Sequence, residues 1–394
     1  MLIRKSTKNH RGYSLGNQVK LIRGGKEYFQ LLHEMIEKAQ DTIHLQVYIF
    51  LADETGGYIA DGLIAAARRN VKVYLLADGY ASQKLPGSFI QKLREAGINF
   101  RFFAPLLKSK YYYFGRRLHH KVVVVDTKYA LVGGMNISNN YNDMPGHPGW
   151  FDFALWVEGN IARELCVLCW KTWNGYPSHM GLTPCELKSP SFDFKPEESY
   201  MIRMRRNDWV RRRIQISKSY EQIFNEAENE IIIVSSYFLP GKRFRKLIAT
   251  AVERGAKVKI VLANISDVAI AKQAERYMYR WLLKNDIEIY EYRPSVLHAK
   301  MAICDNKWLT IGSYNVNNIS AFASIELNLD VCNEKFTTIV KQMIEKIIEI
   351  DCIPVTKNEF RLKNHFFQKL WQDVCYESIR ILFYLFTFYF EQKE

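Results

Sequence analysis

A motif of eighteen residues occurs twice in this chain and constrains its fold more than any other feature. The copies cover residues 119–136, HHKVVVVDTKYALVGGMN, and residues 298–315, HAKMAICDNKWLTIGSYN. Equivalent positions lie at one constant offset: His119, Lys121, Asp126, Gly133 and Asn136 in the first copy, and His298, Lys300, Asp305, Gly312 and Asn315 in the second. Chance repetition of so many constrained positions is negligible, so the chain contains an internal duplication.

The apolar pattern around the two copies is also repeated. Strands and helices alternate from residue 18 onward and again from residue 200 onward, which predicts two α/β/α sandwich halves, each with a largely parallel sheet covered by helices on both faces. A proline-rich, polar stretch between them is the expected linker. We therefore predict five segments: a mobile basic arm at 1–17, the first half at 18–176, the linker at 177–199, the second half at 200–352, and an amphipathic and apolar segment at 353–394.

The duplicated residues suit chemistry at a phosphoester. Within a strand, residues two apart share a face, so each His lies beside its Lys. Lysines bind phosphoryl oxygens as point charges, and carboxamides such as those of Asn136 and Asn315 stabilise charge gained in the transition state. One imidazole can attack phosphorus while the other protonates the leaving oxygen. Because the lysines supply the positive charge, we expect neither a metal nor another cofactor.

Four further residues complete the predicted site. Gly134 and Ser313 directly follow Gly133 and Gly312 of the two motif copies, where the backbone could approach a phosphate group. Asp152 and Glu326 lie in apolar, strand-like runs at corresponding places in the two halves, and we predict that they orient the histidines. Asp126 and Asp305 belong to the motif and are counted with its catalytic set. Their odd spacing from the histidine nevertheless points them away from the imidazole, which favours a structural, hydrogen-bonded role.

This pattern resembles the phospholipase D superfamily, whose signature is the duplicated HxKxxxxD motif followed by GG/GS-x-N. The resemblance covers roughly residues 15–350 and is strongest to the bacterial cardiolipin synthase branch, through residues 19–50, 205–220 and 220–241. It implies two repeats about a pseudo-two-fold axis with one shared active site. It also implies a phosphohistidine intermediate, more often on the first-motif histidine, here His119, followed by attack of an alcohol. The acceptor and donor would then be phosphatidylglycerol-like lipids.

Two other functions are compatible with the same residues. Water as the acceptor would make the chain a phospholipase or phosphodiesterase acting on lipid or nucleic acid, although the aromatic and apolar segments make nucleic acid the weaker candidate. The third possibility is an inactive protein that only binds membranes, which the intact motif residues disfavour. The sequence leaves the oligomeric state open.

The charge balance points to anionic partners. The chain has 55 basic and 41 acidic residues and a net charge of +14, which favours an anionic phospholipid surface. The basic, polar beginning has no apolar core typical of a signal peptide, and no run of 18 apolar residues is present. We therefore expect a peripheral protein on the cytoplasmic side of the cell membrane. The arginine cluster at 203–213 could bind a lipid phosphate or simply be solvated.

Three segments extend this interpretation. Four aromatic residues at 111–114 precede the first catalytic histidine and could form an interfacial mouth or a packed loop. The C-x-x-C of Cys166 and Cys169 is interpreted as buried free thiols, because the odd count of 7 cysteines lacks a disulfide pattern. The apolar run at 379–390 would span about 18 Å as a helix, too short for a bilayer core of about 30 Å. It could be an in-plane membrane anchor or a packing helix.

Overall fold

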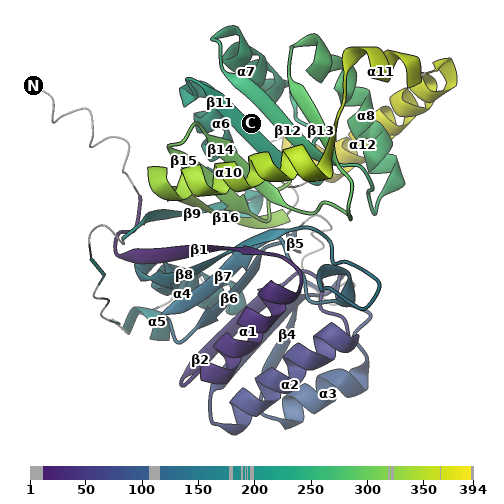
Figure 1. Cartoon of the computed structure of the whole chain (residues 1–394). Helices are drawn as coiled ribbons and strands as arrows, with labels where there is room; N and C mark the ends of the chain where they lie inside the picture. The colour runs from purple at the N-terminus through teal and green to yellow at the C-terminus, as the bar shows by residue number, and fades with distance from the viewer. Residues whose placement is uncertain are drawn as a thin grey trace, which may run out of the picture.

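The computed structural model describes residues 12–105, 116–176, 181–187, 190, 192, 194–195, 199–317, 320, 324–363 and 365–391. Two halves are stacked on each other, the first below the second in Figure 1. The first half contains these elements: β1 (Asn17–Arg23), α1 (Lys26–Lys38), β2 (Thr42–Val47), α2 (Glu54–Arg68), β3 (Lys72–Asp78), α3 (Gly87–Glu95), β4 (Asn99–Phe103), β5 (Arg117–Leu118), β6 (Lys121–Val125), β7 (Tyr129–Gly133), β8 (Phe153–Gly159) and α4 (Asn160–Trp173).

The second half repeats this order of elements. It contains β9 (Met201–Asp208), β10 (Arg213–Ile214), α6 (Gln215–Glu226), β11 (Glu230–Ser235), α7 (Lys242–Glu253), β12 (Lys257–Ala263), α8 (Ala269–Lys284), β13 (Glu288–Tyr292), β14 (Lys300–Cys304), β15 (Trp308–Gly312), β16 (Ser324–Cys332), α10 (Glu334–Asp351) and β17 (Cys352–Pro354). The first sheet has the order β1-β8-β7-β6-β2-β3-β4, and the second contains the equivalent run β9-β16-β15-β14-β11-β12-β13. The duplication expected from the motifs is therefore a duplication of the fold.

The prediction of largely parallel sheets was wrong, because most neighbouring strands are antiparallel. Only β2-β3-β4 and β11-β12-β13 are parallel, and the remaining neighbours in each sheet are antiparallel. The reason lies in the duplicated motif, whose two strands are joined by a tight turn and form a hairpin. Asp126 and Thr127 have φ of 54° and 61° at this turn, and Asp305 has φ of 51° in the second copy. Such left-handed residues fit the twist of a two-strand connection.

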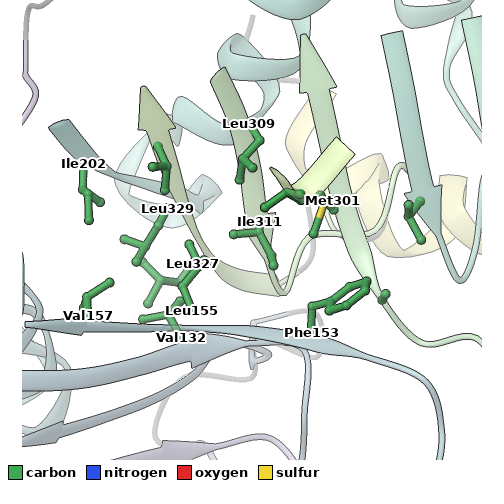
Figure 2. Packing of buried hydrophobic residues seen from close by; sticks show 14 of the residues in the cluster. Val132, Phe153, Leu155, Val157, Ile202, Met301, Leu309, Ile311, Leu327 and Leu329 are labelled. Atoms are coloured by element: carbon green, nitrogen blue, oxygen red, sulfur yellow. The ribbon is translucent and has the colours of Figure 1, made fainter. Parts of the chain in front are cut away.

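The inner faces of the two sheets form one shared hydrophobic core. Figure 2 shows Val132, Leu155 and Val157 of the first half facing Ile311, Leu327 and Leu329 of the second. Helices α4 and α10 add their buried faces to the same core. Helices α1 and α2 cover the outer face of the first sheet, and α6, α7 and α8 cover the outer face of the second. Helices thus lie on both faces of each sheet, and the buried core between the sheets holds the two halves together.

The ends of the chain differ from a plain repeat. Part of the segment expected to be a mobile arm is held in place: Ser14 forms two backbone hydrogen bonds with Ile202 of the second half, and Asn17 pairs with Gly159 of the first half. The expected segment boundaries, including the linker at 177–199, stay predictions. Two helices follow β17: α11 (Lys357–Lys363) and α12 (Phe366–Glu391). Within the described residues, none of the helices has the length and apolarity to cross a bilayer.

Candidate active site

The first-motif histidine is anchored in the opposite half of the molecule. The short strand β5 pairs in parallel with β16 of the second half, and the backbone N–H of His119 donates to the carbonyl of Ile325 at 3.0 Å. The imidazole Nδ1 of His119 then lies 2.8 Å and 2.9 Å from the two carboxylate oxygens of Glu326, the next residue on that strand. The second half therefore fixes both the backbone and the ring of the first histidine.

The second-motif histidine has the reciprocal arrangement. The backbone N–H of His298 donates to the carbonyl of Phe151, in the first half, at 2.7 Å. Its Nδ1 lies 2.6 Å from Asp152, the next residue along. Both carboxylates are buried, with no exposed surface. Asp152 and Glu326 hold the predicted orienting positions, but the pairing is crosswise, each carboxylate serving the histidine of the other half.

Burial dominates the electrostatics of these pairs. It raises the pKa of Asp152 to about 7, against the opposing charge of Lys300. Burial also acts to raise the pKa of Glu326, but the charge and hydrogen bond of His119 outweigh it, so the pKa of Glu326 lies below its usual value. Burial lowers the pKa of His119, with Glu326 opposing it, and lowers the pKa of His298 strongly, with Lys300 adding to the effect. Without a ligand, both imidazoles therefore favour the neutral form.

The two motif lysines are buried beside the histidines. The ammonium of Lys121 donates to the carbonyl of His119 at 2.6 Å, and that of Lys300 lies 2.9 Å from Nδ1 of His298. Burial lowers the pKa of Lys121 to about 7 and that of Lys300 to about 8. Charges from both halves act on one region, since Lys300 lowers the pKa of His119 and Lys121 lowers that of His298. An anion bound there would favour the charged form of both lysines.

The two motif asparagines are positioned by other polar groups. The carbonyl oxygen of Asn136 accepts from the backbone N–H of Ile49 at 3.0 Å, and its amide nitrogen donates to the hydroxyl of Tyr141 at 2.8 Å. The carbonyl oxygen of Asn315 accepts from the hydroxyl of Ser236 at 2.7 Å. In both cases the side-chain oxygen already accepts a hydrogen bond. The amide hydrogen of Asn136 that does not face Tyr141, and the amide nitrogen of Asn315, are then the groups available for an anion.

Gly134 and Ser313, predicted to bind phosphate directly, have a different role in this geometry. Their backbone N–H groups already donate to strand carbonyls, those of Phe153 and Leu327. A Cβ added at Gly134 would lie 2.3 Å from the carboxylate of Asp152, so this position must be glycine. At the equivalent place, the hydroxyl of Ser313 donates to Glu326. Gly134 and Ser313 thus help to position the carboxylates of Asp152 and Glu326.

Asp126 and Asp305 lie away from the histidines and hold the turn of each hairpin. Asp126 accepts backbone hydrogen bonds from Gln40, Asp41 and Thr42 at 2.8 to 2.9 Å, at the start of β2. Asp305 accepts the equivalent bonds from residues 228–230. The structure thus gives them a structural role, and their place in the catalytic set is corrected.

Tyr141 is a residue near the histidines that sequence reasoning missed. Its hydroxyl lies 3.3 Å from Nε2 of His298, and its ring meets that imidazole edge-on. Because Asn136 donates to the same oxygen, the tyrosine proton is free to be donated to Nε2. Comparison of the two motif copies could not reveal Tyr141, because the equivalent position in the second copy, five residues after Asn315, is Ser320. The ring of Tyr48 packs edge-on against the imidazole of His119.

Three other predictions have mixed outcomes. The aromatic residues at 111–114 lie outside the described residues. In the arginine cluster, Arg203 is nearly buried and bound to Asp330 at 2.8 Å, so this member is structural. The interpretation of Cys166 as a free thiol was wrong, because it forms a disulfide with Cys185, in the segment predicted to be a linker, while Cys169 is free and buried. The bond joins residues 19 apart, a separation that no local motif reveals.

A fold of two equivalent halves, each presenting a His-x-Lys pair to a common buried site, defines the phospholipase D-like class of proteins. The comparisons agree. A family model described as "Cardiolipin synthase, PLD-like domain" matches residues 32–145 and 220–348. Cardiolipin synthase B of Escherichia coli K12 is 30% identical over 340 residues, covering 86% of this chain and 82% of its own length. The Salmonella typhimurium counterpart is 31% identical, covering 88% and 84%.

Among solved structures, the phosphatidylserine synthase of Haemophilus influenzae has a TM-score of 0.72 at 14% identity and covers 96% of this chain and 97% of its own. At that identity the likeness shows the fold. The family model and the relatives show the family: this chain belongs to the cardiolipin synthases with phospholipase D-like domains.

Proposed function

We propose that this protein is a phosphatidyltransferase that joins two phosphatidylglycerol molecules into cardiolipin and releases glycerol. The observation that carries the proposal is the crosswise pairing of His119 with Glu326 and of His298 with Asp152. Two imidazoles oriented in this way can share one phosphorus between them, one as nucleophile and one as acid. The names of the relatives, cardiolipin synthase B, support the lipid substrate.

The reaction is a double displacement at phosphorus. In the first step an imidazole nitrogen, assigned to His119 by the family resemblance, attacks the phosphodiester. A P–N bond forms, the P–O bond to the headgroup glycerol breaks, and the departing oxygen takes a proton from His298. In the second step the hydroxyl of another phosphatidylglycerol gives its proton to His298 and attacks phosphorus, which breaks the P–N bond. Atoms and charge balance over the two steps, and the enzyme returns to its starting state.

The other residues supply charge and position. Lys121 and Lys300 offset the negative charge of the equatorial oxygens, and the amide nitrogens of Asn136 and Asn315 donate to the same oxygens. Binding of the anionic phosphodiester raises the low pKa of His298, so substrate binding itself favours the protonated acid that the first step needs. These residues do the chemistry with protein groups alone, and we propose no cofactor.

The proposal places the enzyme at an anionic phospholipid membrane, as a peripheral protein on its cytoplasmic face. Support comes from the net charge of +14 and from the substrate, which is itself a membrane lipid. The oligomeric state is not part of the proposal.

The test is a product assay on the purified full chain. Phosphatidylglycerol labelled in the diacylglycerol part is incubated with the enzyme, and lipids are separated by thin-layer chromatography. We expect labelled cardiolipin from the wild type and from His33→Ala, a histidine of the outer helix α1, and none within the same assay time from His119→Ala or His298→Ala. Cardiolipin formation by either active-site variant at a rate close to that of the wild type would overturn the mechanism. Phosphatidate as the sole product, or cleavage of DNA in a parallel assay, would overturn the transferase assignment.

A further inference from the structure

One face of α12 is largely apolar and exposed from Phe367 to Val374, and Ile381 follows after the polar Glu377 and Ser378. Its opposite face packs on α8: Cys375 is buried with Ala274 and Met278, and Tyr376 stacks on Tyr277 with ring centres 4.2 Å apart. The free face carries a stripe at helical spacing that we call the α12 stripe, namely Phe367, Leu370, Trp371, Val374 and Ile381. Phe367 is 80% exposed and Trp371 is 54% exposed. Exposed aromatic and aliphatic groups in one row indicate a contact surface.

A basic pocket lies at the beginning of this stripe. It has a volume of about 510 Å³ between α8, α11 and the first turn of α12, and two apolar side chains, Leu283 and Phe360, line it. Five cations line it: Arg280, Lys284, Lys357, Arg361 and Lys369. We call these residues the α12 pocket.

The charges of the α12 pocket are only partly neutralised. Arg280 pairs with Asp373 at 3.1 Å and Lys357 with Asp286 at 2.7 Å. The other three cations, Lys284, Arg361 and Lys369, have no carboxylate within ion-pair distance among the described residues. The buried Nε of Arg280 also has no hydrogen-bond partner there. Unpaired cations beside apolar side chains suit a ligand with an anionic group joined to a hydrocarbon.

We propose that the α12 stripe and the α12 pocket form a docking surface for an anionic phospholipid bilayer, with the phosphate of a non-substrate lipid held in the pocket and its acyl chains beside the stripe. The argument is continuity and charge. Lys369 of the pocket and its neighbour Leu370 of the stripe place the exposed apolar face and the pocket within one turn of the same helix. Paired apolar and basic faces are the signature of helices that lie in a membrane interface.

The direction of α12 links this surface to the active site. Arg280 contacts Asp373, whereas Met278 and Ala274 contact Cys375, so residue numbers fall along α8 as they rise along α12. The two helices are antiparallel, and α12 runs toward the beginning of α8. Just before α8, Asp267 accepts a hydrogen bond from Tyr237 and raises the pKa of His298 through its charge.

Exposed apolar side chains also rim that end of α8. Ile265, Val268 and Ile270 flank Asp267 and are about half exposed. The α12 pocket thus lies at one end of this helix pair, and Asp267, whose charge acts on His298, lies at the other. A bilayer that covers both would present its lipid headgroups to the two histidines. This part rests on the proposed function, because it takes a membrane lipid as the substrate.

The test is sedimentation of the full chain with vesicles of phosphatidylglycerol or of phosphatidylcholine. The charge variant Lys284→Ala/Arg361→Ala/Lys369→Ala is compared with Lys218→Ala/Lys335→Ala/Lys346→Ala, which removes the same charge from exposed positions elsewhere. At low salt we expect the first to lose roughly 10- to 100-fold in affinity for phosphatidylglycerol vesicles, because each lysine or arginine adds about fivefold near an anionic surface. The control should lose much less. Equal losses would overturn the pocket.

The stripe is tested with Phe367→Ser/Trp371→Ser against Ile339→Ser/Ile350→Ser, two exposed isoleucines of α10. We expect only the first pair to weaken vesicle binding. Unchanged vesicle binding would overturn the docking surface. A dimeric wild type and a monomeric Phe367→Ser/Trp371→Ser variant in sedimentation velocity, with vesicle binding unchanged, would also overturn it, since the stripe would then join two copies of the chain. An activity assay with short-chain phosphatidylglycerol in detergent separates the docking proposal from the proposed function. The docking variants should keep full activity there, because no bilayer is needed. Absence of cardiolipin from the wild type and from all variants would overturn the proposed function alone.

Discussion

Replacing Glu326 by Gln tests the central claim that the second half activates the histidine of the first. The two residues have nearly the same shape, so the change removes the negative charge while one oxygen remains for His119. In the wild type both carboxylate oxygens contact Nδ1, at 2.8 and 2.9 Å, from a side chain with no exposed surface. A misplaced amide can turn its NH₂ toward Nδ1 and select the wrong tautomer, leaving the attacking nitrogen protonated.

The expected loss is large. Imposing the wrong tautomer on a catalytic histidine can cost roughly 10⁴-fold in kcat. Because the amide oxygen can still face Nδ1 in part of the molecules, we expect kcat to fall by roughly 10²- to 10⁴-fold, with a small change in KM. The charge of Glu326 also raises the pKa of His119, so its loss should move the acidic limb of kcat/KM toward lower pH.

The assay measures glycerol release and cardiolipin formation from short-chain phosphatidylglycerol, with pH varied. The matched control is Asp330→Asn, four residues along the same strand, where a carboxylate of equal burial binds Arg203 instead. We expect this control to lower Tm and to leave kcat of the folded enzyme close to the wild-type value. A kcat for Glu326→Gln within threefold of the wild type would refute the reasoning.

Three further outcomes are expected. Tyr141→Phe should lower kcat by roughly tenfold through loss of the hydroxyl beside His298, and an unchanged kcat would remove Tyr141 from the site. Gly134→Ala should abolish turnover in a folded protein, because its Cβ meets the Asp152 carboxylate at 2.3 Å; circular dichroism checks the fold. The pKa of Lys121 is lowered to about 7, so kcat/KM should fall as pH rises through that value and the ammonium is lost. The bound phosphate raises the pKa of Lys121, so the fall in kcat should occur at higher pH than the fall in kcat/KM. If both fall at the same pH, this expectation is contradicted.

The sequence was sufficient for the parts of the fold that depend on local pattern. The hairpin strands, their histidines and the equivalence of the two halves follow from the spacing in the motifs, because side-chain direction in a strand depends only on parity. Strand direction within the sheet was misjudged. The alternation of strands and helices describes β2-β3-β4 well, but the strands from the motif onward connect by short turns and are antiparallel.

Long-range pairing accounts for the remaining differences. The partner of His119 lies 207 residues away, in the other half, and no local pattern reports which of two equivalent carboxylates it meets. Tyr141 and the Cys166–Cys185 bond occur once, so a comparison of the repeats gave no signal for either.

The crosswise pairing makes a further prediction about how variants combine. If Glu326 acts only through His119, then Glu326→Gln should add little to the loss already caused by His119→Ala, because residues that act as a unit are strongly non-additive. Asp152→Asn should instead lower the residual rate of His119→Ala, since its partner His298 is still working. Pairing within each half predicts the opposite pattern. Residual rates from long incubations of the two double variants distinguish these cases, and a larger added loss from Glu326→Gln than from Asp152→Asn would show that each half orients its own histidine.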